Sequence, residues 1–210
     1  MSLTKQTVAE KLIQIKAIKL QPTNPFTWAS GWNSPIYCDN RLTLSFPEIR
    51  DYIRDEFVRQ INEKYPDVEV IAGVATGAIA QGVLVAQAMN LPFVYIRSSA
   101  KAHGMGNQIE GHLPEGKKVV VVEDLISTGG SSLKAVDALR KAKADVLGMT
   151  AIFTYDFKVA QDNFKNSNCK LAVLSDYHAL LDFALSVDYV KEEQLKTLKE
   201  WRENPSEWNK

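Results

Sequence analysis

Cysteine is scarce in this chain, with two residues among 210. Cys38 and Cys169 belong to no metal-ligand or redox spacing, so both are expected to be reduced, small apolar residues. No run of about eighteen apolar residues and no signal-peptide pattern occurs, which predicts a soluble, cytoplasmic protein without a membrane partner. An excess of charge is missing too, since 25 basic and 25 acidic residues cancel. This balance argues against a nucleic-acid-binding surface.

Internal repeats, low-complexity tracts and linkers are likewise absent from the sequence. A chain of 210 residues with 45% hydrophobic content can bury a substantial core, so one domain is expected. Helical spacing predicts helices over Thr7 to Leu20 and from Pro47 onward, the latter with one apolar stripe. Strands are expected at 68–72, 93–96, 118–122, 146–153 and 171–174. Because helical patterns mostly separate these strands, the sequence predicts an α/β fold with a parallel sheet.

The most informative stretch runs from Val119 to Ser131. Its four consecutive valines suit a strand buried on both faces in the middle of a parallel sheet. Glu123 and Asp124 follow, and are expected at the carboxyl end of that strand, the edge where ligands of open α/β sheets bind. The segment 127–131 then supplies hydroxyls, glycines and backbone N–H groups at the start of a helix, which favours a bound phosphate. The stretch predicts a site for a phosphorylated sugar.

Parts of this stretch also fit a plainer interpretation, because any junction of a strand and a helix can use such residues as turn and cap residues. The complete order is more specific: four apolar residues, two acidic, two apolar, then Ser/Thr and Gly. It resembles the phosphoribosyl-pyrophosphate (PRPP) motif of the type I phosphoribosyltransferases. The resemblance implies an α/β fold with a central, mainly parallel sheet flanked by helices and an amino-terminal hood. Residues 1–210 then form one domain, with helix and hood over about 1–45, core over about 46–190 and a last helix over about 191–208.

The same resemblance implies a role for each residue of the motif. Glu123 and Asp124 contact the ribose hydroxyls, and Asp124 is a catalytic candidate that steadies positive charge developing at the anomeric carbon. The 5′-phosphate is assigned to the turn. The PRPP-binding residues predicted in the motif are Glu123, Asp124, Leu125, Ile126, Ser127, Thr128, Gly129, Gly130 and Ser131.

A second segment, residues 97–112, lacks apolar periodicity and is expected to be a long, mobile loop. Arg97, Lys101 and His103 are cationic groups able to neutralise a departing pyrophosphate, and its glycines would let the loop open and close. A solvated surface loop is the plainer alternative. The order Arg-x-x-x-Lys-x-His-Gly resembles the catalytic loop of orotate phosphoribosyltransferases. By this resemblance the three residues bind PRPP, Lys101 and His103 are catalytic, and the loop acts on the neighbouring subunit of a homodimer.

The pattern Phe-x-x-x-Ser-Gly-x-x-Ser-Pro-x-Tyr at 26–37 is similar to the hood that covers the base in these enzymes, and predicts a β-hairpin over 26–41. Its aromatic residues are expected in the core, so no contact with the base is assigned to Trp28 or Trp32. Gly73 to Ala78 resembles the loop on the pyrophosphate side, although a tight turn explains it equally well.

The sequence also departs from the family pattern. Ala29, Gly77 and Ser98 stand where some members carry lysine, and no arginine follows the fifth strand, where some members hold the orotate carboxylate. Ser127 with neighbouring backbone amides is the family-based candidate for orotate. Arg41 is a second candidate, or an ion-pair partner at the surface.

Together these resemblances imply a pentosyltransferase that makes orotidine 5′-monophosphate and pyrophosphate from orotate and PRPP in pyrimidine (UMP) biosynthesis. Mg²⁺ is expected as the cofactor, bound mainly through substrate oxygens, and no dedicated metal ligand is assigned. Two alternatives stay open: a phosphoribosyltransferase for another base, and a regulator that senses PRPP without catalysis.

Overall fold

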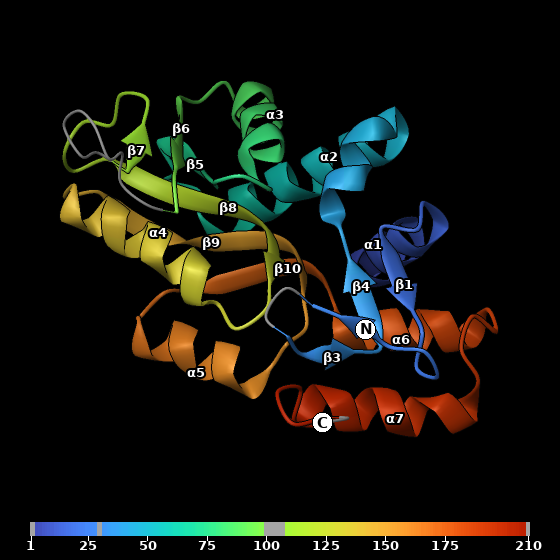
Figure 1. Cartoon of the computed structure of the whole chain (residues 1–210). Helices are drawn as coiled ribbons and strands as arrows, with labels where there is room; N and C mark the ends of the chain where they lie inside the picture. The colour runs from blue at the N-terminus through green and yellow to red at the C-terminus, as the bar shows by residue number, and fades with distance from the viewer. Residues whose placement is uncertain (1–2, 29–30, 99–107, 209–210) are drawn as a thin grey trace.

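The chain alternates strands and helices around one central sheet (Figure 1). The computed structural model describes residues 3–28, 31–98 and 108–208. Its elements, in chain order, are α1 (Leu3–Gln14), β1 (Ile18–Leu20), β2 (Phe26–Thr27), β3 (Asn33–Ser34), β4 (Ile36–Cys38), the 3₁₀ helix η1 (Asn40–Ser45), α2 (Pro47–Lys64), β5 (Val70–Val74), α3 (Ile79–Met89), β6 (Phe93–Ile96), β7 (Ile109–Glu110), β8 (Lys118–Ile126), α4 (Gly130–Lys141), β9 (Asp145–Thr154), α5 (Lys158–Asn166), β10 (Leu171–Asp176), α6 (Tyr177–Ser186) and α7 (Glu192–Glu203).

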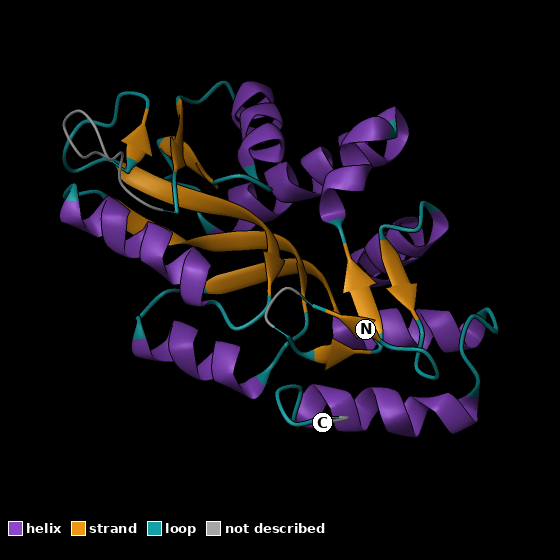
Figure 2. Cartoon of the chain, in the orientation of Figure 1, coloured by secondary structure: helices purple, strands orange, loops and turns teal. Residues whose placement is uncertain are grey.

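The central sheet has six strands in the order β10-β9-β8-β5-β6-β7. All neighbouring strands are parallel except β7, which runs antiparallel to β6. Strand β8 lies between β5 and β9, and its four valines, 119–122, are fully buried. Figure 2 shows α2 and α3 on one face of the sheet and α4 and α5 on the other. The predicted α/β fold with a mainly parallel sheet is confirmed.

Helix α2 forms where the sequence predicts it. Pro47 occupies the first turn, where its missing N–H costs no hydrogen bond. The predicted stripe of Ile49, Ile53, Phe57 and Ile61 is buried. The spacing of these residues at every fourth position therefore correctly identified the face that packs on the core.

The first predicted helix is too long. A helix was expected over Thr7 to Leu20, but α1 ends at Gln14, and Ile18 and Leu20 lie in strand β1. Lys16 has a φ of +57°, a left-handed conformation that stops the helix. Ile18 and Leu20 then alternate as buried residues in β1, which pairs antiparallel with β4. Tertiary pairing overrides the helical spacing here.

The hood, residues 26–41, contains the expected hairpin. Strands β2 and β3 pair antiparallel, with Phe26 opposite Ser34. The chain then enters β4, which belongs to the separate pair with β1, so the hood joins two small sheets (Figure 1). The structure describes the hood apart from residues 29 and 30.

An aromatic cluster joins the hood to the last helix, α7. The ring of Trp28 meets that of Trp201 edge to face at 5.7 Å and that of Tyr155 at 5.2 Å. Trp201 is fully buried and donates from its indole N–H to the backbone carbonyl of Asn33. Trp28 is half-buried and packs against the core, as expected, whereas Trp32 is half-buried and lines a hollow of the surface. Helix α7 is the element that holds the hood against the sheet.

Several strand boundaries differ from the predictions. Strand β5 spans Val70–Val74 and not 68–72, β9 spans Asp145–Thr154 and not 146–153, and β10 ends at Asp176 and not at residue 174. Strand β8 continues through Ile126 instead of ending at residue 122, because its final residues pair with β9 as far as Thr154. Strand β7 lies within the segment expected to be a loop, and pairs with the end of β6. Two residues are too few to produce a periodic signal, so only the pairing identifies β7.

Candidate functional site

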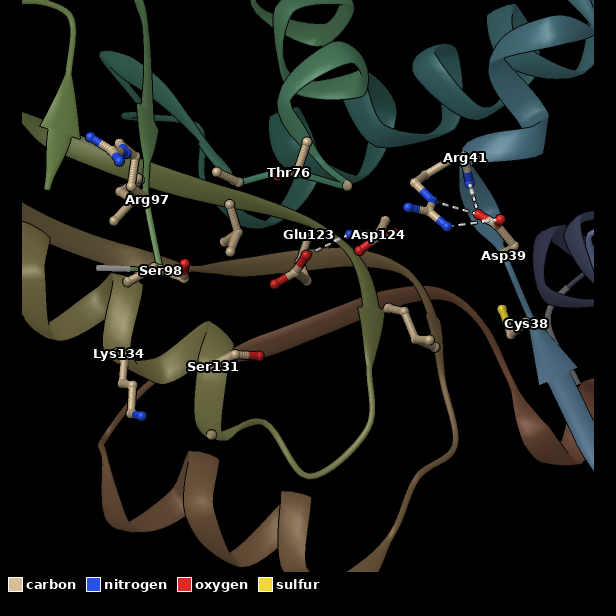
Figure 3. A pocket seen from close by; sticks show the side chains of 17 residues that line it. Cys38, Asp39, Arg41, Thr76, Arg97, Ser98, Glu123, Asp124, Ser131 and Lys134 are labelled. Carbon is tan, nitrogen blue, oxygen red and sulfur yellow. Dashed lines mark hydrogen bonds and ion pairs between the residues drawn. The ribbon is translucent and has the colours of Figure 1, made fainter. Parts of the chain in front are cut away.

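A cavity of about 610 Å³ opens at the carboxyl ends of β5, β6 and β8 (Figure 3). Its volume lies within the range of ligand pockets, about 300–1,000 Å³. Its walls come from the hood and η1, from the loops after β5 and β6, from the end of β8 and from the start of α4. The lining residues are Cys38, Asp39, Arg41, Val74, Ala75, Thr76, Gly77, Ile96, Arg97, Ser98, Glu123, Asp124, Leu125, Gly130, Ser131, Lys134 and Ala135.

The two carboxylates of the motif lie in different surroundings. Glu123 is 5% exposed, and its side chain accepts hydrogen bonds from the Ser132 hydroxyl at 2.8 Å and from the backbone N–H of Asp124 at 3.0 Å. Asp124 is only partly buried. The backbone carbonyl of Asp124 accepts a hydrogen bond from the side chain of Asn40 at 2.7 Å, which ties η1 to the end of β8. The adjacent carboxylates can therefore take different roles, one held in place and one available to a ligand.

Burial raises the pKa of Glu123 well above its usual value, and the neighbouring Asp124 carboxylate adds to the effect. The hydrogen bond from Ser132 acts in the opposite direction but does not outweigh these two causes. A buried carboxyl with a raised pKa makes the folded state less stable at neutral pH than the same site with a neutral side chain. Glu123 is thus kept at a cost to stability.

Replacing Glu123 with glutamine is therefore expected to raise the melting temperature at pH 8 by at least about 2 °C, since ~1 kcal/mol corresponds to about 2–4 °C in a domain of this size. The gain should vanish near pH 4, because below an unfolded pKa of about 4.3 the glutamate is neutral in both states. As pH rises above that value, the unfolded chain releases the proton while the folded chain retains it, so the wild type loses stability. Thermal melts from pH 4 to 8 measure the difference.

Glu115→Gln is the matched control for this prediction. Glu115 is 69% exposed and pairs with Lys143 at the surface, so its replacement should leave the pH dependence of the melting temperature as in the wild type. A Glu123→Gln protein with the wild-type profile would show that Glu123 carries no burial penalty.

The loop after β5 presses against the second carboxylate. A Cβ atom on Gly77 would lie 2.3 Å from Oδ2 of Asp124, so only a glycine leaves that carboxylate where it is. Thr76 and Gly77 both line the cavity, as the resemblance of Gly73 to Ala78 to a ligand-binding loop predicts. The close approach also gives a physical reason why this chain cannot carry a side chain at position 77 without moving Asp124.

Arg97 lies at the end of β6, on the opposite side of the cavity from the hood. Its guanidinium lies 3.6 Å from the Glu110 carboxylate, and its backbone N–H donates to Gln108. The predicted loop residues Lys101 and His103 lie outside the described residues.

The predicted phosphate-binding turn is divided between two places. Gly130 and Ser131 line the cavity at the amino terminus of α4, together with Leu125 from the strand. Ile126 is buried, whereas Ser127, Thr128 and Gly129 are not among the residues of this wall. Thr128 instead lines a smaller hollow of about 370 Å³ beside Trp32. The structure thus brings Arg97, Glu123, Asp124, Leu125, Gly130 and Ser131 together.

Several residues of the site were not predicted, among them Asp39, which pairs with Arg41. Ser132 holds Glu123, and Asn40 holds the backbone at Asp124. Lys134 lines the cavity wall from the second turn of α4, a position that its spacing from Gly130 could have indicated. Cys38 lines the wall as a free cysteine, and burial raises the pKa of its thiol, with a further contribution from Asp124. Asn40 carries no sequence signal, because its partner is 84 residues away.

A mainly parallel α/β sheet with an acidic pair and a helix amino terminus at one ligand-binding edge defines a phosphoribosyltransferase-type domain. Residues 46–186 match the family model of the phosphoribosyl transferase domain. The hood and α7 both lie outside these matched residues.

Orotate phosphoribosyltransferase of Bacteroides thetaiotaomicron is 60% identical over 201 residues, which are 96% of this chain and 95% of that protein. Two solved structures share the fold, each at 23% sequence identity. Orotate phosphoribosyltransferase from Aeropyrum pernix superposes with a TM-score of 0.76, which covers 88% of this chain and 99% of that one. UMP synthase of Leishmania donovani superposes with a TM-score of 0.79, which covers 94% of this chain. The chain spans 42% of the length of that UMP synthase. The protein belongs to the orotate phosphoribosyltransferase family.

Proposed function

We propose that the protein transfers the 5-phosphoribosyl group from PRPP to orotate, giving orotidine 5′-monophosphate and pyrophosphate. The anomeric carbon exchanges its bond to a pyrophosphate oxygen for a bond to a ring nitrogen of orotate, which loses its proton. Positive charge develops on the ribose during this exchange. Preorganised carboxylates beside the ribose stabilise that charge, and no covalent intermediate with the protein is needed.

One observation carries the proposal: Asp124, Glu123, the amino terminus of α4 and Arg97 line one cavity at the carboxyl edge of the sheet. The backbone N–H groups and dipole of α4 suit the 5′-phosphate of the ribose. Arg97 suits the pyrophosphate, since a guanidinium binds phosphate oxygens through two N–H groups. The partly buried carboxylate of Asp124 is available to the ribose hydroxyls that lie between these two anions.

Mg²⁺ belongs to the same proposal. Magnesium keeps several waters and binds through one or two carboxylates together with substrate phosphates. In the described ranges no group of three or more His, Cys, Asp or Glu side chains could hold a metal ion. Asp124 is the carboxylate placed to join such a substrate-bound ion, which would add positive charge beside the pyrophosphate.

The direct test incubates the purified protein with PRPP, Mg²⁺ and one base at a time, and measures pyrophosphate release. Orotate is expected to be the base that turns over. Release with another base alone would identify a phosphoribosyltransferase of different specificity. PRPP binding without release, whatever the base, would favour a PRPP-sensing regulator and contradict the proposal.

A homodimer with shared active sites and a cytoplasmic location complete the proposal. Among the helices that the structure describes, none combines the length and the hydropathy of a membrane span.

Sharing of the site between subunits predicts complementation. Lys101→Ala and Asp124→Ala proteins should each be nearly inactive alone, because each lacks one half of every site. In a mixed dimer one of the two sites would keep both Lys101 and Asp124. Each mixed dimer should therefore have up to about half of the activity of a wild-type dimer. Turnover is measured after subunit exchange, with mixed dimers isolated through two different affinity tags. Inactive mixed dimers would show that Lys101 serves the site of its own chain.

A further inference from the structure

Three basic residues line the cavity, each from a different wall. Arg97 comes from the end of β6, Lys134 from α4 and Arg41 from η1, beside the hood. The proposed substrates carry three anionic groups: the 5′-phosphate, the pyrophosphate and the orotate carboxylate. Lys134 lies on the helix whose amino terminus suits the 5′-phosphate, and Arg97 precedes the loop assigned to pyrophosphate. Arg41 is the remaining basic residue of the described wall, and it lies beside the hood, the segment that by resemblance covers the base.

The Arg41 guanidinium is oriented by its neighbour. Asp39 accepts hydrogen bonds from Nε at 2.7 Å and from Nη2 at 2.9 Å, a two-point pair that sets the plane of the guanidinium. Nη1 has no acceptor among the described residues, and the side chain is 63% exposed although it lines the cavity. A planar donor group with free N–H groups is therefore presented to the cavity.

Arg41 is also held close to the reacting end of the site. Its neighbour Asn40 is 2% exposed and donates to the backbone carbonyl of Asp124, while the Thr43 hydroxyl donates to the carbonyl of Asn40 at 2.6 Å. Figure 3 shows Arg41 and Asp124 on adjoining parts of the same wall. The carboxylate of orotate is attached to the ring carbon next to the nitrogen that attacks, so its partner must lie near the ribose site.

We infer that Arg41 recognises the carboxylate of orotate and so selects this base over uracil, which lacks that group. This inference rests on the proposed function and names the specificity residue of the same site. Asp39 is a positioning residue in this arrangement, because it orients the guanidinium without facing the base. The energetic basis is the strength of a charged, two-point hydrogen bond, and the penalty of leaving the orotate carboxylate without a partner.

The test compares binding of orotidine 5′-monophosphate and uridine 5′-monophosphate, which differ only in this carboxylate. Calorimetry should show the wild type binding the orotidine nucleotide about tenfold to a hundredfold more tightly, the range of one charged hydrogen bond. In Arg41→Gln this ratio should fall to near one, mainly by weaker binding of the orotidine nucleotide, while KM for PRPP stays the same. Arg41→Lys, which keeps the charge without the planar fork, should retain part of the preference.

Arg54→Gln is the matched control. Arg54 forms a similar pair with Asp55, at 2.8 Å, but lies on α2 away from the cavity. It should keep the wild-type ratio, and melting curves establish that both variants fold. A wild-type ratio in folded Arg41→Gln, or a wild type that binds both nucleotides equally, would overturn the inference. Absence of orotate turnover in the wild type would instead contradict the proposed function.

Discussion

Turnover of orotate is expected to fall by about 10²–10³-fold when Asp124 is replaced with alanine, the range found when one preorganised electrostatic group is removed from a site. The reason is that Asp124 is the partly buried carboxylate of the pair and lines the cavity. Single-turnover rates with PRPP and orotate measure the loss at the chemical step.

The fold should not suffer from this replacement. The hydrogen bond from Asn40 goes to the backbone carbonyl of Asp124 and survives the loss of the side chain. Removing the carboxylate also removes one cause of the raised pKa of Glu123, so the melting temperature should stay the same or rise. Asp67→Ala, at a carboxylate 73% exposed and paired with Lys118, is the control that should keep full turnover. An Asp124→Ala protein within a few-fold of the wild-type rate would exclude a catalytic role.

Gly77→Ala is expected to lower kcat/KM by about 10–100-fold. The added methyl carbon would lie 2.3 Å from Oδ2 and 2.5 Å from Cγ of Asp124, far inside van der Waals contact. Either the carboxylate or the loop must move, and small misplacements in an active site can cost about 10²-fold. Steady-state kinetics with both substrates varied measure the change.

A double-mutant cycle distinguishes this cause from a general disturbance of the loop. In an Asp124→Ala background the atoms that would clash are gone, so adding Gly77→Ala should lower kcat/KM little further. Residues in direct contact show such non-additive effects, whereas independent sites do not. If the two losses multiplied, the methyl group would be acting on the loop and not through Asp124.

Local sequence patterns predicted much of the fold. Four valines in a row require a strand buried on both faces, and Pro47 with its apolar stripe requires a helix packed on the core. Local patterns failed where the secondary structure of a residue depends on a partner far away in the sequence. Ile18 continues a helical pattern, yet its pairing with Cys38 in β4 makes it part of a strand. Lys16, at a φ of +57°, carries no sequence signal for the left-handed turn that it makes.

The candidate site divides in the same way. Sequence placed Glu123, Asp124 and the glycine-rich turn at one strand end, because residues adjacent in the chain stay adjacent in the fold. Sequence could not show that Glu123 is buried against Ser132 while Asp124 stays accessible, nor that Thr128 turns toward another hollow. Those differences depend on how α4 and α5 pack on the sheet.

The sequence by itself therefore determined the class of fold and the placement of the acidic pair before a glycine-rich turn, since each depends on periodicity or on the order of neighbouring residues. The binding of PRPP and phosphate by these residues stays a prediction. Tertiary structure alone decided which groups share the cavity. Gly77 packs against the carboxylate of Asp124. Arg41 is held near Asp124 because its neighbour Asn40 donates a hydrogen bond to the backbone of Asp124. Trp201 donates a hydrogen bond to the hood at Asn33. These contacts join segments far apart in the chain, and their energies depend on distance and burial, which no local pattern records.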